Sequence, residues 1–190
     1  MVKRTHILIL LIVLLLIPGA SWAFCKPVRV LAPELNDVRC IGDAICMEDV
    51  SRYEEAAALY DAAFGFVNAM VGVIKERPRA IFCSSQSCFE SFGFDRAAPR
   101  KVGVSGIVVG PRGWKSHTMR HEMIHHLQAE RLGVFEQWRS PEWFKEGMAY
   151  ALSQDPRLVL SEPWHGYRSQ FRAWFRSVGR ERLWTEATTL

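Results

Sequence analysis

The chain has 190 residues, of which 49% are hydrophobic and 23% charged, a composition typical of a globular protein with room for one real core. Its formal net charge is +4, and removal of the first 23 residues would leave 22 basic and 20 acidic side chains. Such a mild balance argues against a nucleic-acid partner. We expect a single domain over residues 24–190, without repeats.

The first 23 residues predict a signal peptide. Lys3 and Arg4 precede an apolar run over residues 7–17, and small residues follow up to Ala23. This run is well short of the ~20 residues that span a bilayer, so we prefer cleavage after Ala23 to an uncleaved anchor. The mature protein is then expected to be exported, either periplasmic or secreted.

Export permits disulfides, and the chain has five cysteines, which are Cys25, Cys40, Cys46, Cys83 and Cys88. The simplest expectation is two short local bridges with Cys25 left over, but the sequence alone does not select the pairing. A cysteine metal site is the less favoured alternative, because neither close pair has two-residue spacing.

The first half of the expected domain begins with an irregular, disulfide-tied segment over residues 24–50. Ser51 and Glu54 have the spacing of a capping box, and apolar residues at helical spacing then predict a core helix that ends before Pro78. A short strand is expected over residues 80–83, followed by a Ser-rich loop and further loop over residues 89–100.

Residues 102–109 form the best strand pattern in the chain, rich in β-branched residues and followed by Gly110-Pro111. Glycines in and around this strand leave its backbone accessible to an added peptide strand. A bulged or twisted strand buried within the sheet is an equally good interpretation.

The next helix is expected to start at Ser116 or Thr118 and to stop at Gly133, and it contains His121-Glu122-Met123-Ile124-His125. Residues four apart lie on one helix face, so His121 and His125 can bind one metal ion while Glu122 faces the open coordination position. This pattern is typical of zinc hydrolases.

A catalytic zinc ion needs a third protein ligand, and we predict Glu146. Ser140 as cap and Pro141 in the first helical position predict a helix from there to Asp155-Pro156. We expect Gly147 to allow a close approach of this helix to the histidine helix. Glu142, one turn before Glu146, is the rival ligand.

Together, His121-Glu-Met-Ile-His125 and Pro141-Glu-Trp-Phe-Lys-Glu146-Gly-Met-Ala-Tyr150 resemble the gluzincin metallopeptidases, particularly the small peptidase-MA-like proteins. In that family the Glu of the second motif is the third zinc ligand, a role that the resemblance places on Glu146 and not on Glu142. The resemblance covers about forty residues, from Thr118 to Ser153, and the spacing between the motifs is two residues longer than the usual eighteen of the aminopeptidases.

Other polar residues near these motifs are candidates for a donor to the transition state. His117 extends the histidine stripe by one turn, Tyr150 lies one turn after Glu146, and His165 and Tyr167 lie in a region where gluzincins often carry such a donor. His126 is rotated by about 100° from His125, so we interpret it as a helix-surface or packing residue.

The tail from Pro163 predicts a helix with a row of arginines, which are Arg168, Arg172, Arg176 and Arg180. Such a row is most often a solvated face. The alternative is weak contact with an acidic partner or a membrane surface.

These patterns predict an α+β domain of zincin type, with a small sheet packed on the active-site helix and further helices. The predicted activity is hydrolysis of a peptide or protein substrate by a Zn²⁺-activated water, with Glu122 as the general base. The alternatives are a non-catalytic, zinc-stabilised protein of the cell envelope and a zinc hydrolase that acts on a non-peptide envelope substrate. The sequence does not predict the oligomeric state.

Overall fold

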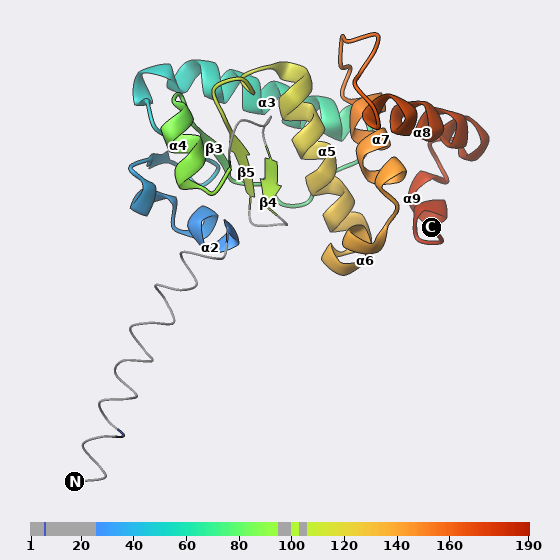
Figure 1. Cartoon of the computed structure of the whole chain (residues 1–190), viewed down its shortest axis with the longest axis horizontal. Helices are drawn as coiled ribbons and strands as arrows, with labels where there is room; N and C mark the ends of the chain where they lie inside the picture. Colours follow the sequence, from blue (N-terminus) through green and yellow to red (C-terminus); the bar gives the residue numbers. More distant parts are fainter. Residues whose placement is uncertain (1–5, 7–25, 95–99, 103–105) are drawn as a thin grey trace.

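The computed structural model describes His6 and residues 26–94, 100–102 and 106–190. The predicted signal peptide and Cys25 lie outside these residues. The described chain is an α+β fold around a mixed sheet with the strand order β1-β2-β3-β5-β4 (Figure 1). The strands are β1 (Arg39–Ile41), β2 (Ile45–Met47), β3 (Ala80–Phe82), β4 (Arg100–Val102) and β5 (Gly106–Val109).

The three central strands, β2, β3 and β5, run parallel and are buried on both faces. Their side chains alternate between two apolar layers, so that Ile107 and Val109 join one cluster whereas Val108 joins the other. Strands that are covered on both sides read as continuous apolar runs, as these do. The edge strands β1 and β4 pair antiparallel with β2 and β5.

The segment expected to be irregular, residues 24–50, is more ordered than predicted. It contains α2 (Lys26–Leu31), a 3-10 helix η1 (Pro33–Asn36) and the hairpin of β1 and β2. A disulfide joins Cys40 to Cys46 across this hairpin, and a second joins Cys83 to Cys88. The expectation of two short local bridges is therefore confirmed.

The first long helix, α3 (Tyr53–Met70), follows a 3-10 turn η2 (Val50–Arg52). The predicted cap at Ser51 is wrong, because the Asp49 carboxylate accepts hydrogen bonds from the Ser51 backbone N–H and hydroxyl. The helix also ends earlier than predicted. Asn68 accepts a hydrogen bond from the Ile74 N–H and so holds the chain beyond α3 in a non-helical course, although Ile74 remains buried.

Two predictions between the disulfide loop and the histidine helix are wrong. A short helix, α4 (Gln86–Ser91), replaces part of the expected loop, because the Ser85 hydroxyl caps it by accepting from the Cys88 N–H. The single strand predicted over 102–109 is instead the antiparallel pair β4 and β5, with Val102 opposite Gly106. Since β5 is paired on both sides, it has no edge to offer to an added peptide strand.

The second half of the chain is helical, with α5 (Ser116–Leu132), α6 (Val134–Arg139), α7 (Glu142–Leu152), α8 (Trp164–Val178) and α9 (Leu183–Ala187). Helices α5, α7 and α8 lie where helices were predicted, whereas the short α6 was not expected. Helices α3 and α5 cover one face of the sheet, α2 and α4 cover the other, and α7 and α8 extend the first layer beyond the sheet (Figure 1).

Helices α7 and α8 pack closely, and Gly147 is the reason. A Cβ atom at Gly147 would lie 2.3 Å from the backbone oxygen of Tyr167. The prediction that Gly147 serves the approach of α7 to the histidine helix is therefore wrong, because the close contact is with α8.

The arginine row on α8 is not one solvated face. Arg168 is buried and donates hydrogen bonds to the backbone oxygens of Arg157 and Leu158, while Arg172, Arg176 and Arg180 are exposed. Within the described residues, no helix combines the length and the apolar character needed to cross a membrane.

Candidate metal centre

A short turn connects the end of β5 to the start of α5, and it is anchored to the sheet. Trp114 packs edge-on against Phe82 and donates a hydrogen bond from its indole nitrogen to the backbone oxygen of Cys83, which ties the turn to the end of β3. One face of α5 then enters the core through apolar residues including Met119, Met123 and Leu127. The histidines at positions 121 and 125 consequently lie on another face, toward α7.

Helix α7 brings Glu146 to the two histidines. The Nε2 atoms of His121 and His125 lie 3.1 Å apart. The Glu146 carboxylate lies 3.5 Å from His121 Nε2 through one oxygen and 3.4 Å from His125 Nε2 through the other. Three potential ligands from two helices thus converge on one point, as the sequence predicted, and could hold a metal ion.

The spacing of these atoms fits a tetrahedral ion. Ligand atoms at about 2.0–2.2 Å from such an ion, as for zinc, lie roughly 3.3–3.6 Å from one another. The two Nε2 atoms, 3.1 Å apart, are slightly closer than this, and each lies near this distance from a different oxygen of Glu146, 3.5 Å for His121 and 3.4 Å for His125. One ion is held by all three residues if a single Glu146 oxygen turns toward both histidines. Two imidazole nitrogens and one carboxylate oxygen are also a donor set that divalent transition metals accept.

The cluster is shielded but not closed. The side chains of His121 and His125 are 12% and 11% exposed, and that of Glu146 is 24% exposed. A bound ion would therefore have protein on one side and an approach from solvent on the other. The cluster is therefore partly open to solvent, most of all at Glu146.

Electrostatic coupling runs through Glu146. Burial lowers the pKa of His121, and it acts on His125 in the same direction, but the hydrogen bond and charge of Glu146 outweigh it and raise the pKa of His125. Burial would raise the pKa of Glu146, but its bonds to both histidines hold it well below its usual range. The Glu146 carboxylate is thus the group that links the pKa values of the two histidines.

Glu122 and Tyr150 border this cluster. Glu122 is buried on α5, and its negative charge is felt by both His125 and Tyr150. The Tyr150 ring lies edge-on to His121 with 4.5 Å between ring centres. Burial, followed by the charge of Glu146, raises the pKa of Tyr150, so its hydroxyl keeps its proton at neutral pH.

The other predicted residues take different positions. Glu142, the rival ligand, is an exposed partner of Lys145 at 2.7 Å. His117 is partly buried near Asp155, and burial lowers its pKa. His165 contacts the Leu160 N–H and Arg168. Of the four candidate donors, Tyr150 is the one placed against a histidine of the cluster.

Two further residues on α8 and α5 have packing roles. Tyr167 stacks edge-on with Trp164 and supplies the backbone that meets Gly147. His126 is buried and lies 3.0 Å from the backbone oxygen of Glu76 and 3.2 Å from Glu130. The interpretation of His126 as a packing residue is confirmed.

Sequence reasoning missed two glutamines, Gln128 on α5 and Gln137 on α6. Both are buried and both contact His125. The available signal was weak: Gln128 lies three residues after His125, so it stands close to the same helix face.

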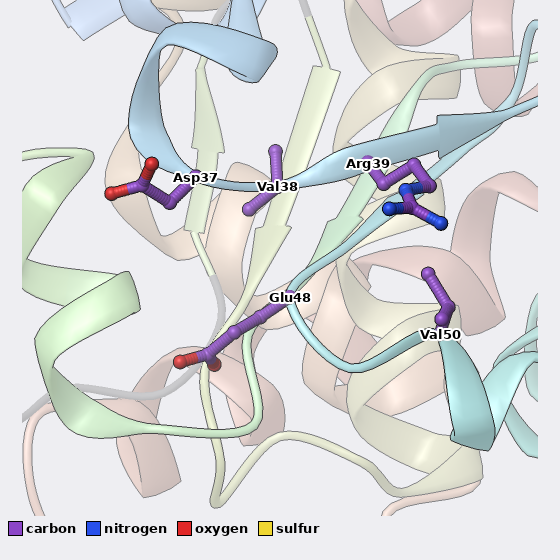
Figure 2. A pocket seen from close by; sticks show the side chains of 5 residues that line it. All are labelled: Asp37, Val38, Arg39, Glu48 and Val50. Atoms are coloured by element: carbon purple, nitrogen blue, oxygen red, sulfur yellow. The ribbon is translucent and has the colours of Figure 1, made fainter.

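A hollow elsewhere on the molecule is unrelated to this cluster. It lies beside the edge strand β1, and it is lined by Asp37, Val38, Arg39, Glu48 and Val50 (Figure 2). The Glu48 carboxylate in this hollow accepts hydrogen bonds from the backbone N–H groups of Ser84 and Ser85. Glu48 therefore has a structural role: it holds the loop that contains the Cys83–Cys88 disulfide.

The two disulfides indicate an oxidising environment of the kind found outside the cytosol. Comparisons of the chain with protein-family models, with curated proteins and with solved structures found no match. The chemistry of the chain is therefore inferred from its partly buried cluster of two histidines and one glutamate, which could hold a metal ion.

Proposed function

We propose that the protein is an exported zinc-dependent metallopeptidase, which hydrolyses peptide bonds with Glu122 as the general base. The observation that carries this proposal is the convergence of His121, His125 and Glu146, whose candidate ligand atoms all lie within 4.8 Å of one another. Glu122 adjoins this cluster in sequence and acts electrostatically on His125. The gluzincin resemblance of the two motifs points to the same four residues.

Each protein group then has a defined task. When bound, zinc would lower the pKa of water toward ~7 and polarise a substrate carbonyl. Glu122 takes the proton of the attacking water and later gives it to the leaving amine, a role worth roughly 10²–10⁴-fold in rate. Tyr150, whose raised pKa keeps its phenolic proton and whose ring contacts His121, is the proposed donor of a hydrogen bond to the transition state.

The partial exposure of the cluster favours catalysis over a purely structural role. Structural zinc sites usually close all four positions with protein ligands, whereas catalytic sites keep one open. Within the part of the chain that the structure describes, the cluster has three candidate ligands, and the most exposed of them, Glu146, is 24% exposed. A scaffold would also have no use for a buried carboxylate such as Glu122 next to the ligands.

A pair of glutamine substitutions tests the proposal. Glu122→Gln should retain one metal ion per chain but lose at least about 10²-fold in turnover of a peptide library. The matched control is Glu142→Gln, at an exposed position on α7, which should leave turnover unchanged. Unchanged activity in Glu122→Gln would refute the assignment.

The same assay addresses the chemical class of the substrate. Peptides and envelope-derived esters and amides are offered to the mature protein with and without a chelator. Chelator-sensitive cleavage of peptides supports the proposal. Chelator-sensitive cleavage of the other substrates alone would replace it with a non-peptide hydrolase.

A further inference from the structure

A buried amide network joins two of the candidate ligands from behind. Gln128 is completely buried, and its amide lies 2.9 Å from His125 Nδ1 and 3.0 Å from the backbone oxygen of Lys145. Lys145 directly precedes Glu146. One side chain of α5 therefore contacts the imidazole of one ligand and the backbone beside another.

The direction of each hydrogen bond in this network is fixed by carbonyl groups. The Lys145 oxygen can only accept, so the Gln128 Nε2 must face it and donate. The Gln128 Oε1 then faces His125 and can only accept. The Nδ1 atom of His125 must consequently carry a hydrogen.

Gln137 on α6 reinforces this orientation. Its Nε2 donates to the backbone oxygen of His125 at 2.7 Å and to Gln128 Oε1 at 3.3 Å. Both acceptors agree with the direction deduced from Lys145. The short helix α6 thus contributes a buried amide to the back of the site, although its other side is exposed at Phe135 and Trp138.

A hydrogen on Nδ1 of His125 determines the state of the other ring nitrogen, Nε2. A neutral imidazole with hydrogen on Nδ1 presents a lone pair at Nε2, the atom that lies 3.4 Å from Glu146 and 3.1 Å from His121. Outer groups that fix a ligand histidine in this way typically change metal affinity by 10–100-fold when they are removed.

We propose that Gln128, supported by Gln137, is a positioning residue: it sets the tautomer of His125 and holds α7, and with it Glu146, at the distance that a metal ion needs. This inference rests on the proposed function, because it assumes that the cluster binds a metal. Its first test does not require the metal.

The first test is nitrogen NMR of the metal-free mature protein, at a pH where His125 is neutral. The expected result is hydrogen on Nδ1 of His125 in the wild type. In Gln128→Leu, which removes the acceptor, a share of the population is expected to shift hydrogen to Nε2. Hydrogen on Nε2 in the wild type would overturn the proposal.

The second test compares zinc dissociation constants. Gln128→Leu and Gln137→Leu should each weaken zinc binding, the former by about 10–100-fold. The matched control is Asn68→Ala, which removes another amide, bonded to Phe64 and Ile74 and located on a different helix from the candidate ligands. It should lower the midpoint of urea unfolding and leave zinc affinity unchanged.

Two outcomes of the second test would overturn the proposal: zinc affinity within about threefold of wild type in folded Gln128→Leu, or equal weakening by Asn68→Ala. If Gln128→Leu does not fold, Gln137→Leu decides by the same criterion. If the wild type binds no zinc, the proposed function is refuted instead. The tautomer measurement would still test whether Gln128 sets the tautomer of His125.

Discussion

At the scale of single residues, the cluster depends on the Glu146 carboxylate, which contacts the imidazoles of both His121 and His125. Each oxygen of Glu146 faces a different histidine, and this sharing keeps the pKa of Glu146 low and that of His125 high. A metal ion that enters the cluster takes the place of a proton between these groups. Glu146 is therefore the residue whose loss should be felt most directly in metal binding.

Replacement of Glu146 by Ala is expected to abolish stoichiometric zinc binding, because two histidines alone leave the ion without its anionic ligand. Metal content per chain after dialysis against a zinc buffer is the measurement. Glu142→Ala on the same helix should keep its zinc, since Glu142 pairs with Lys145 at the surface. Equal zinc content in both variants would place the third ligand elsewhere.

Tyr60 offers a test of pH dependence away from the ligands. Its hydroxyl donates to the backbone oxygen of Pro78, and burial raises its pKa to about 12. Ionisation is thus opposed in the folded state, so this contribution to stability is complete below the unfolded pKa of about 10 and is lost as the pH rises toward 12. Tyr60→Phe should remove that part of the decline.

Urea unfolding of both proteins between pH 8 and 12 provides the measurement, and their difference isolates Tyr60 from other titrating groups. At neutral pH, Tyr60→Phe is expected to cost about 1–3 kcal/mol, because the Pro78 oxygen loses its buried donor. A difference between the two proteins that does not vary from pH 10 to 12 would contradict the expectation.

Some residues of the site could be predicted from the sequence because their relation is fixed within one helix, and others could not. His121, Glu122 and His125 could be predicted because the spacing of one helix fixes their relation. Glu146 required a second motif. Gln128 and Gln137 could not be assigned from the sequence, because their contacts form only in the folded protein. The fold brings Lys145 of α7 to the Gln128 amide and brings the Gln137 amide of α6 to the His125 backbone.

At the scale of elements, α7 is held between α5 and α8. It contacts α8 along much of its length, and Gly147 permits this contact next to the ligand Glu146. Aromatic residues extend the interface, where Phe144 packs against Phe171 and Trp174. The position of Glu146 is consequently set by packing on the side of α7 that faces away from the histidines.

Gly147→Ala is expected to destabilise the protein by about 1–3 kcal/mol or more, because the added Cβ would meet the immovable backbone of Tyr167. It should also weaken zinc binding by displacing Glu146. The matched control is Gly65→Ala within α3, where the added Cβ meets nothing within 4 Å. That change should stabilise the helix by about 0.5–1 kcal/mol.

Urea unfolding of the metal-free proteins measures both glycine substitutions on one scale. If Gly147→Ala proved as stable as the wild type, α7 and α8 would have to separate more easily than their packing implies.

The elements also show where local patterns mislead. The helix α3 was expected to continue because Val71 and Ile74 keep its apolar spacing, yet Asn68 bonds the Ile74 N–H and the chain has already left the helix. The antiparallel strands β4 and β5 looked like one strand because Val102, at the end of β4, belongs to the same β-branched pattern as the Ile-Val-Val run of β5. Apolar spacing reveals neither the hydrogen bond of Asn68 to Ile74 nor the pairing of β5 with the distant strand β3.

At the scale of the molecule, the disulfides and the candidate metal cluster lie in different halves of the chain. Both disulfides lie between Cys40 and Cys88, around the sheet, while the candidate ligands lie on α5 and α7. The core cluster that includes α3 and α5 connects the halves. Redox state and metal content should therefore act on stability through separate parts of the fold.

A variant with Cys40→Ser and Cys46→Ser is expected to lose about 2–3 kcal/mol of stability, since the short loop is no longer closed in the unfolded chain. Its zinc affinity should stay within about threefold of the wild type, because the ligands are on other elements. Chemical denaturation and zinc titration of the same sample provide both values. A matching loss of zinc affinity would show that the halves are coupled.

The support of α7 by α8 has a consequence for the order in which the site is made during synthesis. A nascent chain that ends just after Leu152 already contains both histidines and Glu146, but it lacks the helix against which α7 rests. Translation adds that helix last among the parts that hold the ligands. A C-terminally clipped molecule that lacks α8 would therefore hold a metal ion poorly.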